Sequence, residues 1–139
     1  MKKIESKFTM SKINFDARKF ESIQNSEAGE VSAETIFQYH HKEDLVWAEY
    51  EGGEIVFGNL IAKVSESGEL EMRYQHLNKQ GALMTGVCHS TPEILADGRL
   101  RLHEKWQWTS GDLTKGESVV EEIKTPQQAD RVLIHLKLF

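Results

Sequence analysis

The stretch HEKWQW at residues 103–108 sets the carboxylate of Glu104 close to two tryptophans. Alternate side chains of a β-strand share one face, so Glu104 would lie beside Trp106 and Trp108. An ionised carboxylate among indole rings is costly unless it is paired or hydrogen-bonded. The pattern therefore predicts either a buried hydrogen-bonding network or a binding site for a small ligand.

A rhythm of glycine-containing turns marks the elements that would hold this strand in place. These turns end at Gly53, Gly68, Gly81, Gly98 and Gly111. The segments between them are rich in β-branched and aromatic residues, many of them alternating, as in consecutive hairpins. We expect strands at residues 19–24, 34–41, 45–51, 54–64, 69–77, 83–91, 99–109 and 117–124.

A second glycine follows every other turn at the same offset, at Gly58, Gly86 and Gly116, which makes a loose two-strand repeat of roughly 28–30 residues. A meander of eight strands closes most naturally into a barrel, because closure removes the exposed strand edges. We therefore predict an all-β fold, a single antiparallel up-and-down eight-stranded barrel of calycin-like or lipocalin-like architecture.

The barrel is predicted to occupy residues 18–124, after an N-terminal arm at residues 1–17. The remaining segment, residues 125–139, carries helix signals instead, with Thr125 as an N-cap and Pro126 at the first helical position. We expect a short C-terminal helix packed outside the barrel, with a frayed tail as the alternative.

Turn geometry predicts which side chains point inward. A three-residue turn that ends in a left-handed glycine fixes the pairing of the two flanking strands. The predicted pairs include Val64 with Leu70, His76 with Met84, and Ser90 with Glu104. Even-numbered residues would then face the interior, whereas the opposite face of the strands at 69–77 and 99–109 is mostly charged. A two-residue turn at Asp97–Gly98 would instead bury His89 and Thr91.

The predicted interior contains most of the side chains that could bind a ligand, namely Glu104, His76, Tyr74, Trp106, Trp108, Ser90, Cys88 and Met84. A two-residue turn at Gly52–Gly53 would add Trp47 and Glu49. A three-residue turn there would turn Val46, Ala48 and Tyr50 inward instead. We carry Trp47 and Glu49 as candidate ligand-binding residues.

The topology predicts a mouth at one end of the barrel. The turns at 51–53, 79–81 and 109–115 and the long segment 25–34 would all lie at that end. A long loop over an aromatic-lined opening is typical of a binding pocket. An eight-stranded barrel is wide enough to be filled by side chains or to hold one small ligand. We predict a small-molecule-binding protein with a polar and aromatic pocket.

Two other functions remain open on the sequence. The first is an enzyme that uses Glu104 and His76 as acid and base on a small acyl or amino-acid substrate. The second is a filled barrel with a structural or protein-interaction role. Cys88 and His76 share a face, but a lone buried cysteine is more often inert. No HExxH, CxxC, Walker or GxGxxG spacing is present, so we predict no metal and no cofactor.

The amino-acid composition limits the kinds of partner that the protein is expected to bind. The formal charge is −5 and acidic and basic residues are interleaved, which predicts no nucleic-acid partner and no anionic membrane surface. No run approaches the roughly 18 apolar residues of a membrane span. The single cysteine excludes an internal disulfide and favours the reducing cytoplasm. A homodimer through an outer barrel face is the remaining expected partner.

Several short motifs in the second half of the chain resemble those of a family of small bacterial proteins. The shared residues are Tyr74-Gln75-His76, Gly86, Cys88, Ser90-Thr91-Pro92-Glu93, Asp97-Gly98-Arg99 and Glu104-Lys105-Trp106. The resemblance covers roughly residues 18–123. Members often carry the label N-acetylglutamate synthase, which implies an acetyltransferase. Such enzymes resemble a mixed α/β fold with a Q/RxxGxG/A loop before a helix, and this sequence has no such loop. That activity is therefore the runner-up.

Overall fold

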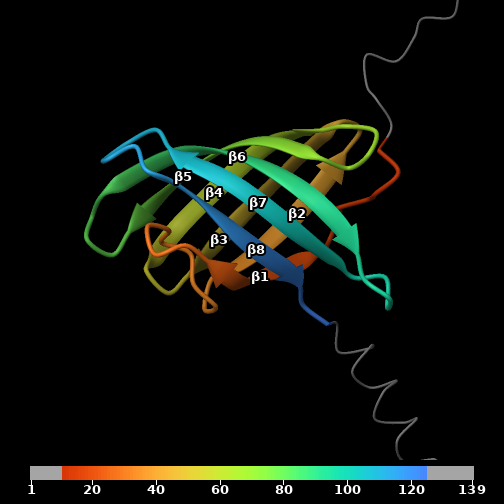
Figure 1. Cartoon of the computed structure of the whole chain (residues 1–139), viewed down its shortest axis with the longest axis horizontal. Coiled ribbons are helices and arrows are strands. Elements are labelled where there is room, and N and C mark those ends of the chain that lie inside the picture. The colour runs from red at the N-terminus through yellow and green to blue at the C-terminus, as the bar shows by residue number, and fades with distance from the viewer. Residues whose placement is uncertain (1–10, 125–139) are drawn as a thin grey trace, which may run out of the picture.

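The computed structural model describes residues 11–124, which form a closed barrel of eight antiparallel strands (Figure 1). Each strand pairs with its neighbours in the sequence, and the first pairs with the last. The strands are β1 Lys19–Asn25, β2 Ile36–Lys42, β3 Leu45–Gly52, β4 Ile55–Val64, β5 Leu70–Asn78, β6 Leu83–Ile94, β7 Leu100–Trp108 and β8 Lys115–Glu122.

The predicted all-β up-and-down barrel is confirmed, with every predicted strand present. The predicted register is confirmed as well: Val64 pairs with Leu70, His76 with Met84, and Ser90 with Glu104. The turns set this register because Gly68, Gly81 and Gly98 each have a positive φ, which glycine adopts without strain. The predicted C-terminal helix lies outside the described residues.

The end of the barrel opposite the mouth is closed by aromatic packing. Tyr39 and Phe20 lie edge to face with their ring centroids 4.8 Å apart, and Phe15 packs against Tyr39 at 6.1 Å. All three side chains are fully buried. Phe15 belongs to the segment that the sequence assigned to the N-terminal arm, so residues just before β1 contribute to the core.

The β3–β4 hairpin corrects one prediction. Gly52 and Gly53 both have positive φ, and a bulge between Tyr50 and Gly52 shifts the pairing by one residue, so that Tyr50 lies opposite Gly58. Tyr50 is consequently buried, as Val46 and Ala48 are. The prediction of a two-residue turn at Gly52–Gly53 without a bulge is therefore wrong.

Trp47 and Glu49 therefore lie on the outer face, and their prediction as interior residues is wrong. Trp47 stacks on His40 with centroids 5.1 Å apart, and Glu49 Oε1 lies 2.8 Å from His40 Nε2. The double glycine is the physical reason, because it permits the bulge that reverses the parity of β3.

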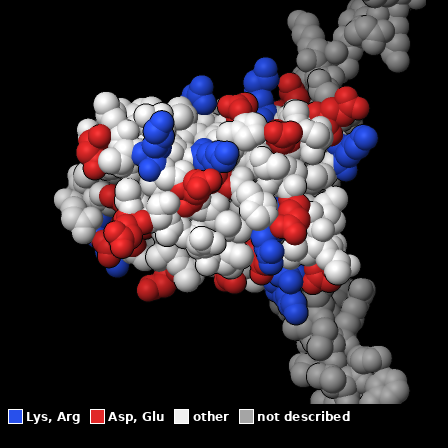
Figure 2. All heavy atoms as spheres, in the orientation of Figure 1, with Lys and Arg blue, Asp and Glu red and all other residues white. Residues whose placement is uncertain are grey.

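The outer surface is polar and mixed in charge. Lysine, arginine, aspartate and glutamate side chains are interspersed on the face shown in Figure 2. His89, for example, points outward between Glu69 and Glu71, so the alternative register that would bury it is wrong. No helix that is long and apolar enough to cross a bilayer occurs in the part of the chain that the structure describes.

Candidate functional site

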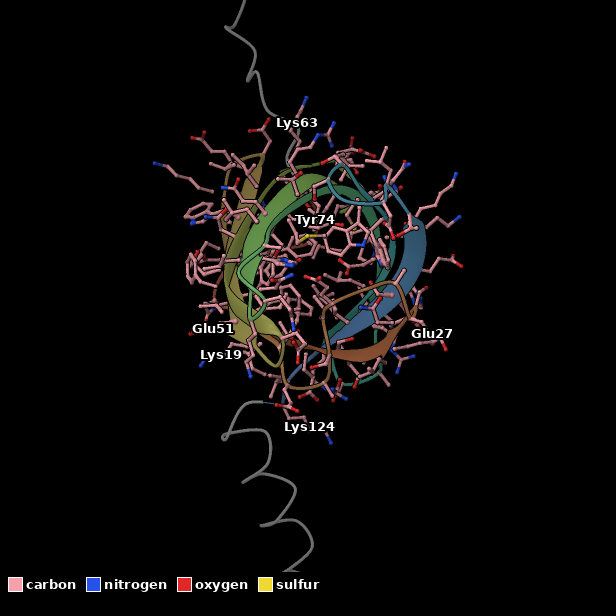
Figure 3. All side chains as sticks on the ribbon, turned by 90° about the vertical axis from the view of Figure 1, so that its left-hand side faces the viewer. Lys19, Glu27, Glu51, Lys63, Tyr74 and Lys124 are labelled. Carbon is pink, nitrogen blue, oxygen red and sulfur yellow. The ribbon has the colours of Figure 1, made fainter. Side chains whose placement is uncertain are left out.

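A cavity of about 60 Å³ lies inside the barrel near the mouth. The segment 26–35 between β1 and β2, here called the mouth loop, contributes Gly29, Glu30 and Val31 to its lining. Figure 3 views this end, with the Tyr74 side chain directed into the barrel. The barrel wall contributes Asn25, Phe37, Tyr50, Leu60, Met72, Tyr74, His76, Cys88, Glu104, Trp106, Trp108 and Ser118.

A row of polar side chains crosses the inner wall beside this cavity. Asn25 on β1 pairs with Ser118 on β8, Ser118 with Glu104 on β7, and Glu104 with Ser90 on β6. The row runs obliquely along the barrel wall. Asn25 ends β1 just before the mouth loop, whereas Ser90 pairs with Leu70 at the start of β5, toward the opposite end of the barrel. We call these four side chains the polar row.

Glu104 is the charged member of the polar row. The Ser118 hydroxyl donates a hydrogen bond of 3.2 Å to Glu104 Oε1. Protein surrounds the carboxyl, and the partly exposed Glu104 lines both this cavity and a second pocket shared with outward residues such as His103 and Lys105. This burial raises the pKa of Glu104 from its ordinary value of 4.5 to about 7, against the opposing effect of the neighbouring Ser118 and Ser90 hydroxyls.

Two further polar atoms near Glu104 are buried without a hydrogen-bond partner among the described residues. They are Asn25 Oδ1 and Ser90 Oγ, the two ends of the polar row. The Asn25 amide nitrogen is engaged, since it donates to the Val31 carbonyl at 2.9 Å. Native interiors rarely leave such atoms unpaired, and the one on Asn25, which lines the cavity, indicates room there for a bound group.

Aromatic rings form the other wall, and each lies over a glycine on the next strand. Tyr50 pairs with Gly58 and Tyr74 with Gly86, and a Cβ at either glycine would overlap the ring. A Cβ on Gly116 would lie 2.5 Å from Trp106 Cζ2. The glycine repeat seen in the sequence therefore has one cause: every second hairpin holds a ring flat against the wall.

Trp108 links this aromatic wall to the mouth loop. Its ring centroid lies 5.7 Å from those of Tyr74, His76 and Trp106. Its indole nitrogen donates a hydrogen bond of 3.0 Å to the Ala28 carbonyl. Such edge-to-face and tilted arrangements fix the orientation of the rings that line the cavity.

A second connection to the mouth loop runs through His76. The Tyr50 hydroxyl lies 2.9 Å from His76 Nδ1, and His76 Nε2 lies 2.7 Å from Glu30 Oε1. The Asn78 amide donates to both oxygens of Glu30, at 3.3 and 3.1 Å. With the proton on Nε2, His76 donates to Glu30 and accepts from Tyr50, which satisfies the whole chain of hydrogen bonds.

A family model described as avidin-like protein matches residues 13–123, nearly all of the described barrel. The chain belongs to the avidin-like family. No curated protein and no solved structure matches it. The family match begins just before Phe15, in agreement with the buried position of that residue.

The structure brings most of the predicted site residues to the cavity of this avidin-like barrel. Those that line it are Glu104, His76, Tyr74, Trp106, Trp108 and Cys88. Ser90 is fully buried on the same inner face but does not line the cavity, and Met84 lies at the rim, where Ser110 Oγ is 3.9 Å from its sulfur. Burial raises the pKa of the Cys88 thiol, which disfavours a nucleophilic thiolate.

Other lining residues of the avidin-like barrel were not predicted. Ser118 has a detectable signal, because it stands at an inward position of β8 opposite Glu104. Asn25 and Glu30 have none, since the segment that holds them has no hydrophobic periodicity. Among residues 11–124 no group of three or more His, Cys, Asp or Glu side chains is arranged to hold a metal ion.

Proposed function

We propose that this avidin-like barrel binds one small organic molecule in the cavity beneath the mouth loop. The observation that carries the proposal is a cavity lined by a carboxylate, Glu104, by aromatic rings, and by Asn25, whose buried Oδ1 lacks a partner. Avidin-like barrels bind small ligands such as biotin, which supports the class of function without naming the ligand. A few placed polar groups in a mostly apolar pocket are typical of such sites.

The filled-barrel alternative agrees less well with these observations. A barrel closed by its own side chains would pack to the density of other protein interiors and would satisfy its buried polar atoms. The polar row instead leaves Asn25 Oδ1 without a partner beside the cavity. A ligand in the cavity would supply the missing hydrogen bond of Asn25.

Native mass spectrometry of freshly purified protein tests the proposal. We expect an additional small mass on the wild type and its loss from Ser118→Leu, which fills the cavity. Val119→Leu, which changes the neighbouring outward side chain, is the matched control and keeps the mass. Bare wild-type protein from several expression hosts, together with no thermal shift from biotin or a library of small metabolites, would overturn the proposal.

A second candidate, acid–base catalysis, is favoured by one observation. A carboxyl with a pKa of about 7 can both give and take a proton near neutral pH. The substrate would be a small acyl or amino-acid compound held where we place the ligand. The implied N-acetylglutamate synthase activity gains no support, because residues 11–124 include no helix whose N-terminus could bind a pyrophosphate. Release of the bound molecule chemically changed by wild type but unchanged by Glu104→Gln would identify an enzyme.

We further propose a cytoplasmic homodimer. The outer face of β3 and β4 supports the dimer, because Ile61 is 58% exposed beside Trp47, and Phe57 is 50% exposed on the same strand as Ile61. Light scattering after gel filtration should show Ile61→Lys as a monomer and leave Ile94→Lys, at the far end of the barrel, unchanged. The buried reduced thiol of Cys88 supports the location.

A further inference from the structure

We propose that the ligand is a small organic cation, an ammonium or guanidinium group that carries N–H donors and binds against the Glu104 carboxylate. The inference rests on the proposed ligand-binding function and specifies the chemical class of the ligand. It follows from the charges that line the cavity, the direction of the unsatisfied hydrogen bonds, and the orientation of the aromatic wall.

The charged side chains that line the cavity favour a cation. The cavity lining contains the two carboxylates of Glu30 and Glu104 and no lysine or arginine. His76 is the one side chain in that lining that could carry a positive charge, and it is engaged by Glu30 and Tyr50. A buried carboxylate without a cation is unfavourable. A ligand cation would supply the missing partner, whereas an anion would place like charges together in a medium of low dielectric constant.

The two carboxylates are not equivalent. Both oxygens of Glu30 accept hydrogen bonds from the described residues, from His76 Nε2 and the Asn78 amide. Glu104 receives one hydrogen bond of regular geometry, from Ser118 to Oε1, and has the Ser90 hydroxyl as a second polar neighbour. A carboxylate can accept about four hydrogen bonds, so Glu104 keeps acceptor capacity that a ligand donor can reach.

The unsatisfied atoms around Glu104 point to the same chemistry. Asn25 Oδ1 can only accept a hydrogen bond, and it is buried without a donor. Ser90 Oγ, fully buried at the other end of the polar row, can accept as well as donate. Asn25 and Glu104 both line the cavity, so a ligand there meets two acceptors of the polar row, whereas Ser90 lies deeper in the wall. A ligand head with several N–H donors complements them better than a carboxylate or a carbonyl.

Aromatic side chains lie beside this row. Trp106 and Trp108 occupy the next two inward positions of β7 after Glu104, toward the mouth, and Tyr74 lies opposite Gly86 beside Trp108. Cations are attracted to the faces of such rings, most strongly when the contact is desolvated. At about 60 Å³ the cavity is small for a ligand pocket, so it has room for a cationic head group, with an attached chain directed toward the mouth.

Three probes with the same four-carbon chain test the inference: n-butylammonium, n-butanol and butyrate. Binding is followed at pH 8 through the indole ¹H–¹⁵N signals of Trp106 and Trp108, which line the cavity. We expect butylammonium to bind wild type about tenfold or more tightly than either other probe, since a hydrogen bond to a charged group contributes about 1.5–3 kcal/mol. Glu104→Gln should remove this preference, and Glu69→Gln, which changes a half-buried carboxylate that pairs with the outward-facing His89, should preserve it.

The outcomes separate this inference from the function on which it rests. Equal or tighter binding of butanol or butyrate, or an unchanged ammonium preference in Glu104→Gln, would overturn the cation and leave ligand binding intact. A neutral or anionic molecule recovered by native mass spectrometry would do the same. Absence of any ligand in either experiment would overturn both. If Glu104→Gln fails to fold, Asn25→Leu, which removes a second acceptor, must weaken butylammonium selectively.

Discussion

His76 Nε2 on β5 lies 2.7 Å from Glu30 Oε1 on the mouth loop, although the two residues are 46 positions apart in the chain. The histidine is buried, and the glutamate also accepts from the Asn78 amide. These hydrogen bonds and the one from Trp108 to the Ala28 carbonyl attach the middle of the loop to the barrel wall. The cover of the cavity is thus held by polar contacts, which can be broken one at a time.

The first prediction concerns this attachment. Glu30→Ala should lower the free energy of unfolding by about 1–3 kcal/mol, because it leaves the buried His76 and Asn78 donors without their acceptor. It should also speed hydrogen exchange of the Gly29 amide, which is bonded to Ser26 within the loop. Urea denaturation and exchange mass spectrometry measure the two effects. Glu27→Ala, an exposed change in the same loop, should alter neither; equal effects of both variants would contradict the assignment.

The second prediction concerns the ring that lies over Gly86. Gly86→Ala should destabilise the barrel by about 1–3 kcal/mol, because the new methyl group would overlap Tyr74 and push its ring into the cavity. Near-UV circular dichroism should report the displaced ring. In a Tyr74→Ala background the same glycine change should cost less, and a double-mutant cycle measures that coupling. Additive penalties would show that the ring does not need the glycine.

The fold could be predicted from the sequence because its information is local. Each glycine turn sets the pairing of its own two strands, so the inward parity of Glu104 follows from Gly98 alone. The Gly52–Gly53 turn is the exception. Two consecutive glycines permit a bulge, and no neighbouring residue indicates whether the bulge forms. Trp47 and Glu49 were misplaced for that reason.

The site was predicted less completely because part of it depends on contacts between distant segments. The strand residues of the cavity wall follow from parity. Glu30 reaches His76 from a loop without periodicity, and Phe15 enters the core from a segment with no strand pattern. Such contacts are decided by how the closed barrel positions its ends, which no short stretch of sequence encodes.

The third prediction compares two adjacent glutamates at the end of β8. Glu122 accepts from the buried Leu100 amide at 3.0 Å and from Arg18 Nη1 at 2.7 Å, whereas Glu121 pairs with arginines on the outer face. Glu122→Ala should lower the free energy of unfolding by about 3 kcal/mol, because it leaves a buried backbone donor and a cation without their partner. Glu121→Ala should cost about 1 kcal/mol or less. Urea denaturation of both variants at pH 7 tests this, and similar costs would contradict it.

The fourth prediction is a pH dependence that originates at Glu104. Burial raises its pKa from 4.5 to about 7, so the folded state holds this proton more tightly than the unfolded state does. Near pH 4.5 and below, the carboxyl of the folded protein is protonated and its burial lowers the free energy of unfolding little. Between pH 4.5 and 7 the free energy of unfolding falls by up to about 3 kcal/mol, because the carboxyl is ionised in the unfolded chain but resists ionisation in the folded one. Glu104→Gln cannot ionise, so its stability relative to wild type should rise over this window and level off above pH 7. Urea denaturation in steps of pH measures the difference, and a constant difference from pH 4.5 to 8 would place the carboxyl in contact with bulk water.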